Sequence, residues 1–349
     1  MTKRKQGIRG AALALILILL TVWTAACGAK EAATQTSPAS AVPAGSAAAG
    51  GEGRVQQLPE TLRIGFISAN NKSVITGPEG WAQTKGYLEG ELHKYGVKEF
   101  KYFTFPNGPN LNEALSAGTL DVGIYGDTPA INGRSAGLKT RLINQSQINM
   151  NAWLTAKADG PKTVADLKGQ KVATSQGSYM SRYLLGLLKE QGLEKEVKVL
   201  HLLPADAEAA LARGDIAAFA YPTGFGPLLQ KKGYVAIDEA ALHPALQGSS
   251  VTVVTEDYVQ RNPQFPKLWN DIRARAVSEI RADSEAYFQF YADASGYPLD
   301  VVKASFKIEQ WPQEAFPADG LKLLQGAKQF LIDQGLAKKD FVIDDWIAR

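Results

Sequence analysis

The feature that most constrains the fold of this chain is an alternation of strand-like and helix-like segments that occurs twice. The first series begins at TLRIGFIS and continues through KEFKYFTFP, PNLNEALSAG and DVGIYG. The second series contains GQKVATS, SYMSRYLLGLLKEQG, EVKVLHLLP, ADAEAALARG and IAAFAYP. Strands that alternate with helices are typical of parallel sheets covered by helices. We therefore predict the α/β class, with one such unit for each series.

The two series share a weak internal repeat. LNEALSAGTLDVGIYGD corresponds to AEAALARGDIAAFAYPT, and each copy has a helix, a glycine that ends it and a buried strand. The repeat predicts two lobes, with the chain crossing to the second near residues 151–157 and returning near 248–254. We assign residues 59–152 and 250–349 to lobe 1 and residues 153–249 to lobe 2. Sheets of this kind bind ligands at the carboxyl ends of strands and at helix N-termini.

The N-terminal segment belongs to neither lobe. Residues 1–10 are basic, and an apolar run of about 13 residues follows, which is short for a membrane span. Two alanines then precede Cys27, the only cysteine. This pattern resembles a bacterial lipoprotein signal, although Thr24 stands where that signal more often has leucine. We predict that residues 1–26 are a signal peptide and that the protein is extracytoplasmic and lipid-anchored through Cys27. The alternative, an uncleaved membrane anchor, also places the folded part outside the cytoplasmic membrane.

Residues 27–58 are rich in Ala, Gly, Ser, Thr and Pro and have almost no large apolar side chains, so we predict a flexible tether. Cleavage removes four basic residues and no acidic one, so the 38 basic and 35 acidic residues of the chain become 34 and 35. This balance provides no basic field for nucleic acid. Because Cys27 is lipidated and the three histidines are far apart in sequence, we expect no metal and no cofactor.

One junction in the first series, VGIYGDTPAI, combines unusual residue types. A strand-like run ends at Gly126, and Asp127, Thr128 and Pro129 follow. Asp127 or Thr128 can cap the next helix, and Pro129 fits its first turn. A helix N-terminus also offers unpaired N–H groups and partial positive charge to an anion. We expect that these residues either bind a ligand at the start of the helix or form a cap that serves only that helix. If they bind an anionic ligand, the N–H groups and Thr128 are better suited to contact it than the Asp127 carboxylate is.

The second series offers the same arrangement in SQGSYMSRY. Gln176, Gly177 and Ser178 open a helix directly after the strand-like KVATS. The N–H groups of Ser178 and Tyr179, together with the Ser178 hydroxyl, can hold oxyanion oxygens without an arginine. The alternative is an ordinary start of a helix.

Four segments carry a resemblance to a known family: FPNGPNLNEALSAGTLDVGIYGDTPAI, KTVADLKGQKVATSQGS, LLPADAEAALARGDIAAFAYP and TEDYVQRNP. They resemble the periplasmic or lipid-anchored substrate-binding proteins of ABC importers. Within these proteins, the group that binds aliphatic sulfonates, nitrate and taurine is the most similar. The resemblance implies a two-lobed, periplasmic-binding-protein-like fold of type II with a hinged cleft. It also implies that an anionic headgroup sits between helix N-termini of both lobes.

The resemblance implies further site residues. The family uses the loop after the first strand, which here contains Ser68 and Asn70, and Asn107 lies near the same mouth by analogy. These residues are equally consistent with solvated turns. Relatives often carry an aromatic residue, an acid and a proline after the strand that is here IAAFAY, but this chain has YPTGF and no acid. The missing acid weakens the case for a ligand amine such as that of taurine. Tyr221 and Phe225 either line a pocket for an apolar tail or pack in the core.

We therefore predict a monomeric substrate-binding lipoprotein, not an enzyme, that delivers an anionic small molecule to an ABC permease and ATPase. An aliphatic sulfonate is the first choice of ligand, with nitrate, taurine or a thiamin-precursor pyrimidine as alternatives. A ligand sensor that docks to a membrane signalling protein is the alternative role. The pyrimidine synthases that share this architecture need clustered Cys and His residues, which this chain lacks. Serine-hydrolase and P-loop motifs are also absent from the sequence.

Overall fold

The computed structural model describes residues 57–68 and 74–349. The predicted signal peptide and Cys27 lie outside the described residues, as do most of the predicted tether and Asn70. Among the helices of the described residues, none has the length and apolar character that crossing a bilayer requires.

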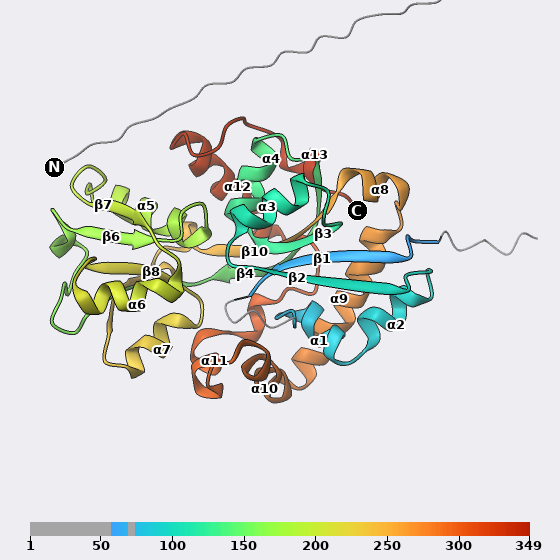
Figure 1. The fold of residues 1–349 in the computed structure, drawn as a ribbon, viewed down its shortest axis with the longest axis horizontal. Coiled ribbons are helices and arrows are strands. Elements are labelled where there is room, and N and C mark those ends of the chain that lie inside the picture. The colour runs from blue at the N-terminus through green and yellow to red at the C-terminus, as the bar shows by residue number, and fades with distance from the viewer. Residues whose placement is uncertain (1–56, 69–73) are drawn as a thin grey trace, which may run out of the picture. The chain divides into compact units, whose positions relative to one another are not determined.

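The first sheet has five strands in the order β2-β1-β3-β10-β4 (Figure 1). Their bounds are β1 (Thr61–Ile67), β2 (Glu99–Phe105), β3 (Val122–Gly126), β4 (Thr140–Met150) and β10 (Gly248–Thr255). β1 pairs in parallel with β2 and β3, whereas β10 runs antiparallel to both of its neighbours. Leu62, Ile64 and Phe66 alternate along β1 and are buried, which gives this strand a continuous apolar face.

The second sheet has five strands in the order β7-β6-β8-β5-β9. Their bounds are β5 (Ala152–Ala156), β6 (Lys171–Thr174), β7 (Lys198–His201), β8 (Ala218–Pro222) and β9 (Val235–Glu239). β6 pairs in parallel with β7 and β8, and β5 runs antiparallel to β8 and β9. In both sheets the first parallel strand therefore lies between the second and the third. The segments that repeat in the sequence occupy equivalent places, ending in β3 and in β8.

The prediction of parallel sheets is correct for the direction of four strands in each sheet and wrong for β10 and β5, which run antiparallel to both of their neighbours. The chain passes from β4 to β5 between Met150 and Ala152, and it returns from β9 to β10 between Glu239 and Gly248. β5 enters the second sheet opposite Pro222, where β8 ends, and β10 enters the first sheet beside the end of β3. A strand that starts where its neighbour ends must run antiparallel to it. The lobe boundaries drawn from the sequence stay a prediction.

Helices cover both faces of each sheet (Figure 1). One face of the first sheet packs against α1 (Pro78–Thr84), α2 (Tyr87–His93), α8 (Glu256–Arg261), α9 (Phe265–Ala282), α10 (Ser284–Ser295) and α11 (Leu299–Ser305). The other face packs against α3 (Gly108–Ser116), α4 (Asp127–Ser135), α12 (Ala318–Asp333) and α13 (Ile343–Trp346). The second sheet lies between α5 (Tyr179–Glu190) on one face and α6 (Pro204–Arg213) with α7 (Phe225–Lys231) on the other. Short 3₁₀ turns are η1 (Ala165–Leu167), η2 (Ala240–Leu242), η3 (Pro244–Leu246) and η4 (Ile308–Gln310).

Candidate functional site

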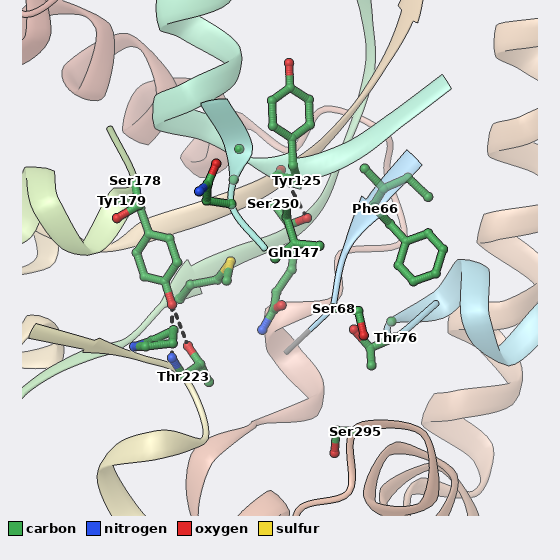
Figure 2. Close-up of a pocket in the computed structure, with 18 of the residues that line it drawn as sticks. Phe66, Ser68, Thr76, Tyr125, Gln147, Ser178, Tyr179, Thr223, Ser250 and Ser295 are labelled. Carbon is green, nitrogen blue, oxygen red and sulfur yellow. Dashed lines mark hydrogen bonds between the residues drawn. The ribbon is translucent and has the colours of Figure 1, made fainter. Parts of the chain in front are cut away.

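The carboxyl ends of the six strands that pair in parallel lie at one cavity. Its lining includes residues at or just beyond the carboxyl ends of β1, β2 and β3 in the first sheet and of β6, β7 and β8 in the second. The cavity volume is about 420 Å³, which lies within the usual range for small-molecule sites. Ligands of α/β proteins bind at this edge of the sheet. The cavity is therefore the candidate binding site (Figure 2).

Helices from both lobes also begin at this cavity. Asn107 and Ser178, which line it, are the N-cap residues of α3 and α5. The Asn107 carboxamide oxygen accepts from the N–H of Asn110 at 2.9 Å, and the Ser178 hydroxyl accepts from the N–H of Ser181 at 3.2 Å. A helix start carries partial positive charge and leaves N–H groups without partners inside the helix. One helix from each lobe thus contributes positive potential to the cavity.

Charged side chains are absent from the part of the lining that the structure describes. No Lys, Arg, His, Asp or Glu occurs among these residues. The polar side chains of the lining are those of Ser68, Thr76, Asn107, Ser146, Gln147, Ser175, Ser178, Thr223, Ser250 and Ser295. A charged ligand in this cavity therefore meets neutral donors and backbone dipoles in place of a counter-ion.

The predicted ligand-binding residues fall into three groups. Those that line the cavity are Ser68, Asn107, Gly126, Ser178 and Tyr179. Those that do not line it are Asp127, Thr128, Gln176, Gly177 and Tyr221. Asn70 lies outside the described residues.

The residues outside the lining have definite positions of their own. Gln176 is exposed to solvent. A Cβ atom at Gly177 would lie 3.3 Å from the ring of Pro109, so the residues just before α5 lie against the first turn of α3 across the lobes. Tyr221 is fully buried and its ring stacks on Phe225, with centroids 5.5 Å apart. Tyr221 thus supports the cavity wall from behind, while Phe225 lines the cavity.

The predicted capping of α4 by Asp127 or Thr128 is wrong. The N-cap residue is Gly126, and no side chain there accepts a hydrogen bond from the first turn. The buried Asp127 carboxylate accepts from the N–H and the hydroxyl of Ser249 at 2.8 and 3.0 Å and from the Thr128 hydroxyl at 2.9 Å. Arg182 of α5 lies 3.4 Å from the same carboxylate and donates to the Thr128 hydroxyl at 3.2 Å. These partners hold Asp127 away from a capping position and join α4 to α5 across the lobes.

Ser178 and Tyr179 have protein partners for their hydroxyl groups. The Ser178 hydroxyl donates to the carbonyl of Ser175 at 2.5 Å. The Tyr179 hydroxyl lies 3.2 Å from the carbonyl of Asn151 and accepts from the N–H of Thr223 at 3.0 Å (Figure 2). Burial raises the pKa of the Tyr179 hydroxyl to about 12, so it is neutral at physiological pH. The N–H of Ser178 also donates to the carbonyl of Ser175, at 3.3 Å, so the prediction that it holds a ligand oxygen is wrong. The α5 start offers a ligand the N–H groups that follow Ser178 and the Tyr179 ring.

Sequence reasoning missed Gln147 of β4. Its side chain is 7% exposed and extends into the cavity (Figure 2), and its Nε2 has no hydrogen-bond partner among the described residues. A buried donor without a partner costs about 1–3 kcal/mol, so a ligand oxygen that accepts from Gln147 recovers this cost. The available signal was the polar triplet QSQ inside an otherwise strand-like segment.

A buried arginine holds two walls of the cavity in place. Arg273 of α9 donates at 3.3 Å to the carbonyl of Ser146, a cavity residue of β4, and at 2.6 Å to that of Pro312, which follows the cavity residue Trp311. Burial lowers the pKa of Arg273, and attraction to the buried Glu79 opposes that effect. Because Arg273 is not part of the lining, its charge supports the walls without contacting a ligand.

Comparison with known proteins assigns this chain to a family. A model of the family described as NMT1/THI5 like matches residues 81–282. The chain belongs to the NMT1/THI5-like family. A protein of Escherichia coli (strain K12) that is named as an aliphatic sulfonates-binding protein is 30% identical over 269 residues, which are 76% of this chain and 80% of that protein.

Solved structures show the same fold as this NMT1/THI5-like chain. The periplasmic aliphatic sulphonate binding protein SsuA from Escherichia coli superposes with a TM-score of 0.65 at 26% identity, covering 83% of this chain and 98% of SsuA. The desulfurization enzyme DSZB superposes with a TM-score of 0.64 at 19% identity, covering 83% of this chain and 96% of the enzyme. The predicted two-lobed, periplasmic-binding-protein-like fold is confirmed. The aromatic residues from Tyr291 to Trp311 lie beyond the segment that the family model matches.

Proposed function

We propose that this protein is the extracytoplasmic substrate-binding component of an ABC importer and that it binds an organic sulfonate in the cavity between its lobes. The observation that carries the proposal is a cavity that gathers six strand ends and helix starts from both lobes while its described lining has no charged side chain. Proteins named for sulfonate binding are similar over most of their length, which supports the same ligand class here.

The energies available at this site suffice for such a ligand. A helix N-terminus stabilises an anion by about 0.3–1 kcal/mol when exposed and by about 2 kcal/mol when partly buried. Hydrogen bonds to an ionised group add about 1.5–3 kcal/mol each. Micromolar affinity needs about 8 kcal/mol net, after the costs of association and closure. Two helix starts, two or three N–H groups and burial of an apolar tail meet this requirement without an arginine.

The cavity disfavours two of the alternative ligands. Taurine carries an ammonium group, and the described lining has no carboxylate to receive it. Nitrate is a four-atom ion, and it would leave most of the 420 Å³ cavity unfilled. Both arguments favour a sulfonate with an uncharged organic tail.

The lining also supports binding rather than catalysis. A hydroxyl nucleophile needs an adjacent base, and the described lining has no His, Lys or carboxylate to serve as one. No group of three His, Cys, Asp or Glu residues that suits a metal ion occurs in the described part of the chain. The likeness to DSZB concerns the fold alone, and a fold does not fix an activity.

The proposal includes attachment to the membrane through lipidated Cys27, with residues 1–26 as signal peptide, and action as a monomer that delivers ligand to a permease. The basic start, the short apolar run and the alanines before Cys27 support the anchor. Fatty-acid labelling in cells tests it. Labelling that persists in the Cys27→Ala variant would refute the anchor and leave the ligand assignment standing.

Calorimetric titration of the full chain in a non-ionic detergent tests the ligand. We expect C1–C8 alkanesulfonates to bind with affinities that increase with tail length. Nitrate and taurine should bind far more weakly. Binding of nitrate or of a pyrimidine, together with no response to any sulfonate, would overturn the assignment.

A further inference from the structure

The cavity lining contains an unusual share of aromatic rings. Eight of its 34 described residues are aromatic: Phe66, Tyr125, Tyr179, Phe225, Tyr291, Tyr297, Phe306 and Trp311. The last four come from α10 and the segments that follow it in lobe 1, and Phe225 begins α7 in lobe 2. We call Phe225, Tyr291, Tyr297, Phe306 and Trp311 the aromatic wall.

Rings of the aromatic wall pack against one another in two groups. Tyr291 and Phe306 have centroids 4.3 Å apart, and Phe306 stacks on Trp311 with centroids 6.1 Å apart and planes inclined by 18°. Across the lobes, Phe225 meets the edge of Tyr297 with centroids 5.7 Å apart and planes at 81°. Edge-to-face and offset contacts are the geometries that aromatic rings prefer. A further ring in the cavity would extend an existing aromatic cluster.

A glycine allows the two lobes to meet at this wall. Gly224 has a φ of 95°, and a Cβ atom there would lie 2.5 Å from the ring of Tyr297. Tyr297 therefore packs directly on the backbone that precedes Phe225. Both lobes thus contribute rings to the aromatic wall.

Polar groups lie elsewhere around the same cavity. Asn107 and Ser178 mark the helix starts, and the amide of Gln147 extends into the middle of the cavity (Figure 2). Figure 2 also shows that Ser295, at the end of α10, lies well apart from Ser178. A ligand with its headgroup at the helix starts and Gln147 would therefore direct its tail toward α10 and the aromatic wall.

The volume of the cavity fits such a tail. A space of about 150 Å³ is enough to hold a benzene ring. The cavity of about 420 Å³ therefore accommodates a sulfonate headgroup together with a ring, whereas a one-carbon tail would leave most of it to water.

We infer that the preferred ligand is an arenesulfonate, a sulfonate carried on an uncharged aromatic ring that packs against the aromatic wall. This inference rests on the proposed function and narrows it from sulfonates in general to one class. The ring is uncharged because the described lining offers no side chain of either charge to a second ionised group. A linear chain of equal carbon number would lose more conformational freedom and would make no edge-to-face contact.

Titration of the full chain in a non-ionic detergent with three sodium salts tests the inference. Benzenesulfonate and n-hexanesulfonate have equal carbon numbers, and methanesulfonate has the headgroup alone. We expect benzenesulfonate to bind about 30-fold or more tighter than methanesulfonate, from burial of the ring. We expect it to bind about threefold to tenfold tighter than n-hexanesulfonate, from the aromatic contacts.

Substitutions test whether the aromatic wall causes the preference for benzenesulfonate over n-hexanesulfonate. Phe225 is half-buried, so Phe225→Leu keeps an apolar side chain and removes one ring. The variant should lose the advantage of benzenesulfonate over n-hexanesulfonate. Tyr297→Leu should reduce it in the same way. Phe103→Leu, at a half-exposed ring outside the cavity, is the matched control and should preserve it.

The outcomes separate the two proposals. If n-hexanesulfonate binds as tightly as benzenesulfonate, or if the ring preference survives in both wall variants, the arenesulfonate inference is wrong and the proposed function stands. If none of the three sulfonates binds, the proposed function itself is wrong, and the inference falls with it.

Discussion

Two neighbouring regions of this protein handle charge in opposite ways. The described lining of the cavity consists of Gly126 and other uncharged residues, and it presents neutral donors and helix starts to a ligand. One residue further along the chain, the carboxylate of Asp127 is completely buried and paired with Arg182. Both regions lie at the start of α4, yet among the described residues the contact between the lobes contains ionised side chains and the lining of the cavity does not.

The difference has a physical reason. A buried charge is tolerated when it has a partner, and Asp127 has Arg182, Ser249 and Thr128 as partners within the protein itself. A transport receptor must also exist without its ligand, and a side-chain charge in its cavity would then lack a partner. In the absence of ligand, helix dipoles and backbone N–H groups without a partner cost less free energy than an unpaired side-chain charge does. In the part of the chain that the structure describes, ionised side chains therefore hold the architecture together and neutral groups face the cavity.

Removing the arginine of the buried pair should give the largest effect. Arg182→Met keeps most of the side-chain volume but leaves Asp127 as an uncompensated buried charge. We expect the free energy of unfolding to fall by about 3–5 kcal/mol, as measured by urea denaturation.

A double variant and a surface variant serve as controls for this prediction. Asp127→Asn combined with Arg182→Met removes both charges and should recover part of the loss. Arg213→Ala, at an exposed pair with Asp215, should unfold like the wild type. Equal stability of Arg182→Met and the wild type would show that the pair does not hold the lobes together.

Much of the fold follows from the sequence, because hydrophobic periodicity and glycine stops are local signals. The helix that ends at Gly214 and the alternating strand β1 are examples. The direction of β5 and β10 was not predictable in this way, since it depends on where the chain crosses between sheets.

The site was predicted only where backbone geometry defines it. Ser178 was found because residues that open a helix have a recognisable composition, whereas Asn107 came from the family resemblance. Asp127 was misassigned as a cap because its partners, Arg182 and Ser249, are distant in sequence. Gln147 was missed because a polar residue in a strand reveals neither its face nor its lack of a partner.

Two glutamines on β4 allow the same comparison between the cavity and the supporting structure, with smaller expected effects. Gln147→Leu removes an unpartnered amide, so ligand affinity should fall about tenfold while stability is unchanged or rises. Gln145 is fully buried and donates to the carbonyl of Gly320 at 2.9 Å. Gln145→Leu should therefore lower the free energy of unfolding by about 1–3 kcal/mol and leave affinity nearly unchanged.

Calorimetry with benzenesulfonate and urea denaturation of both glutamine variants measure the two quantities. If Gln147→Leu binds as tightly as the wild type, Gln147 does not contact the ligand. If Gln145→Leu weakens binding more than Gln147→Leu does, the separation between cavity and scaffold on β4 is wrong.

The smallest expected effect is that of pH on affinity. The described lining has no His, Lys or carboxylate, and a sulfonate stays ionised throughout the range from pH 5 to pH 9. Burial raises the pKa of Tyr179 to about 12 and also raises the pKa of the other lining tyrosines, Tyr125, Tyr291 and Tyr297, so all four stay protonated there. Affinity measured by calorimetry at pH 5, 7 and 9 should therefore agree within about twofold.

Above pH 10 the same tyrosines should make stability fall. The unfolded chain then releases phenolic protons that the folded chain retains, and for Tyr179 the loss develops between pH 10 and about 12. A tenfold change in affinity between pH 5 and pH 9 would mean that an ionisable side chain meets the ligand. In that case the contrast between a neutral cavity and a charged lobe contact would not hold.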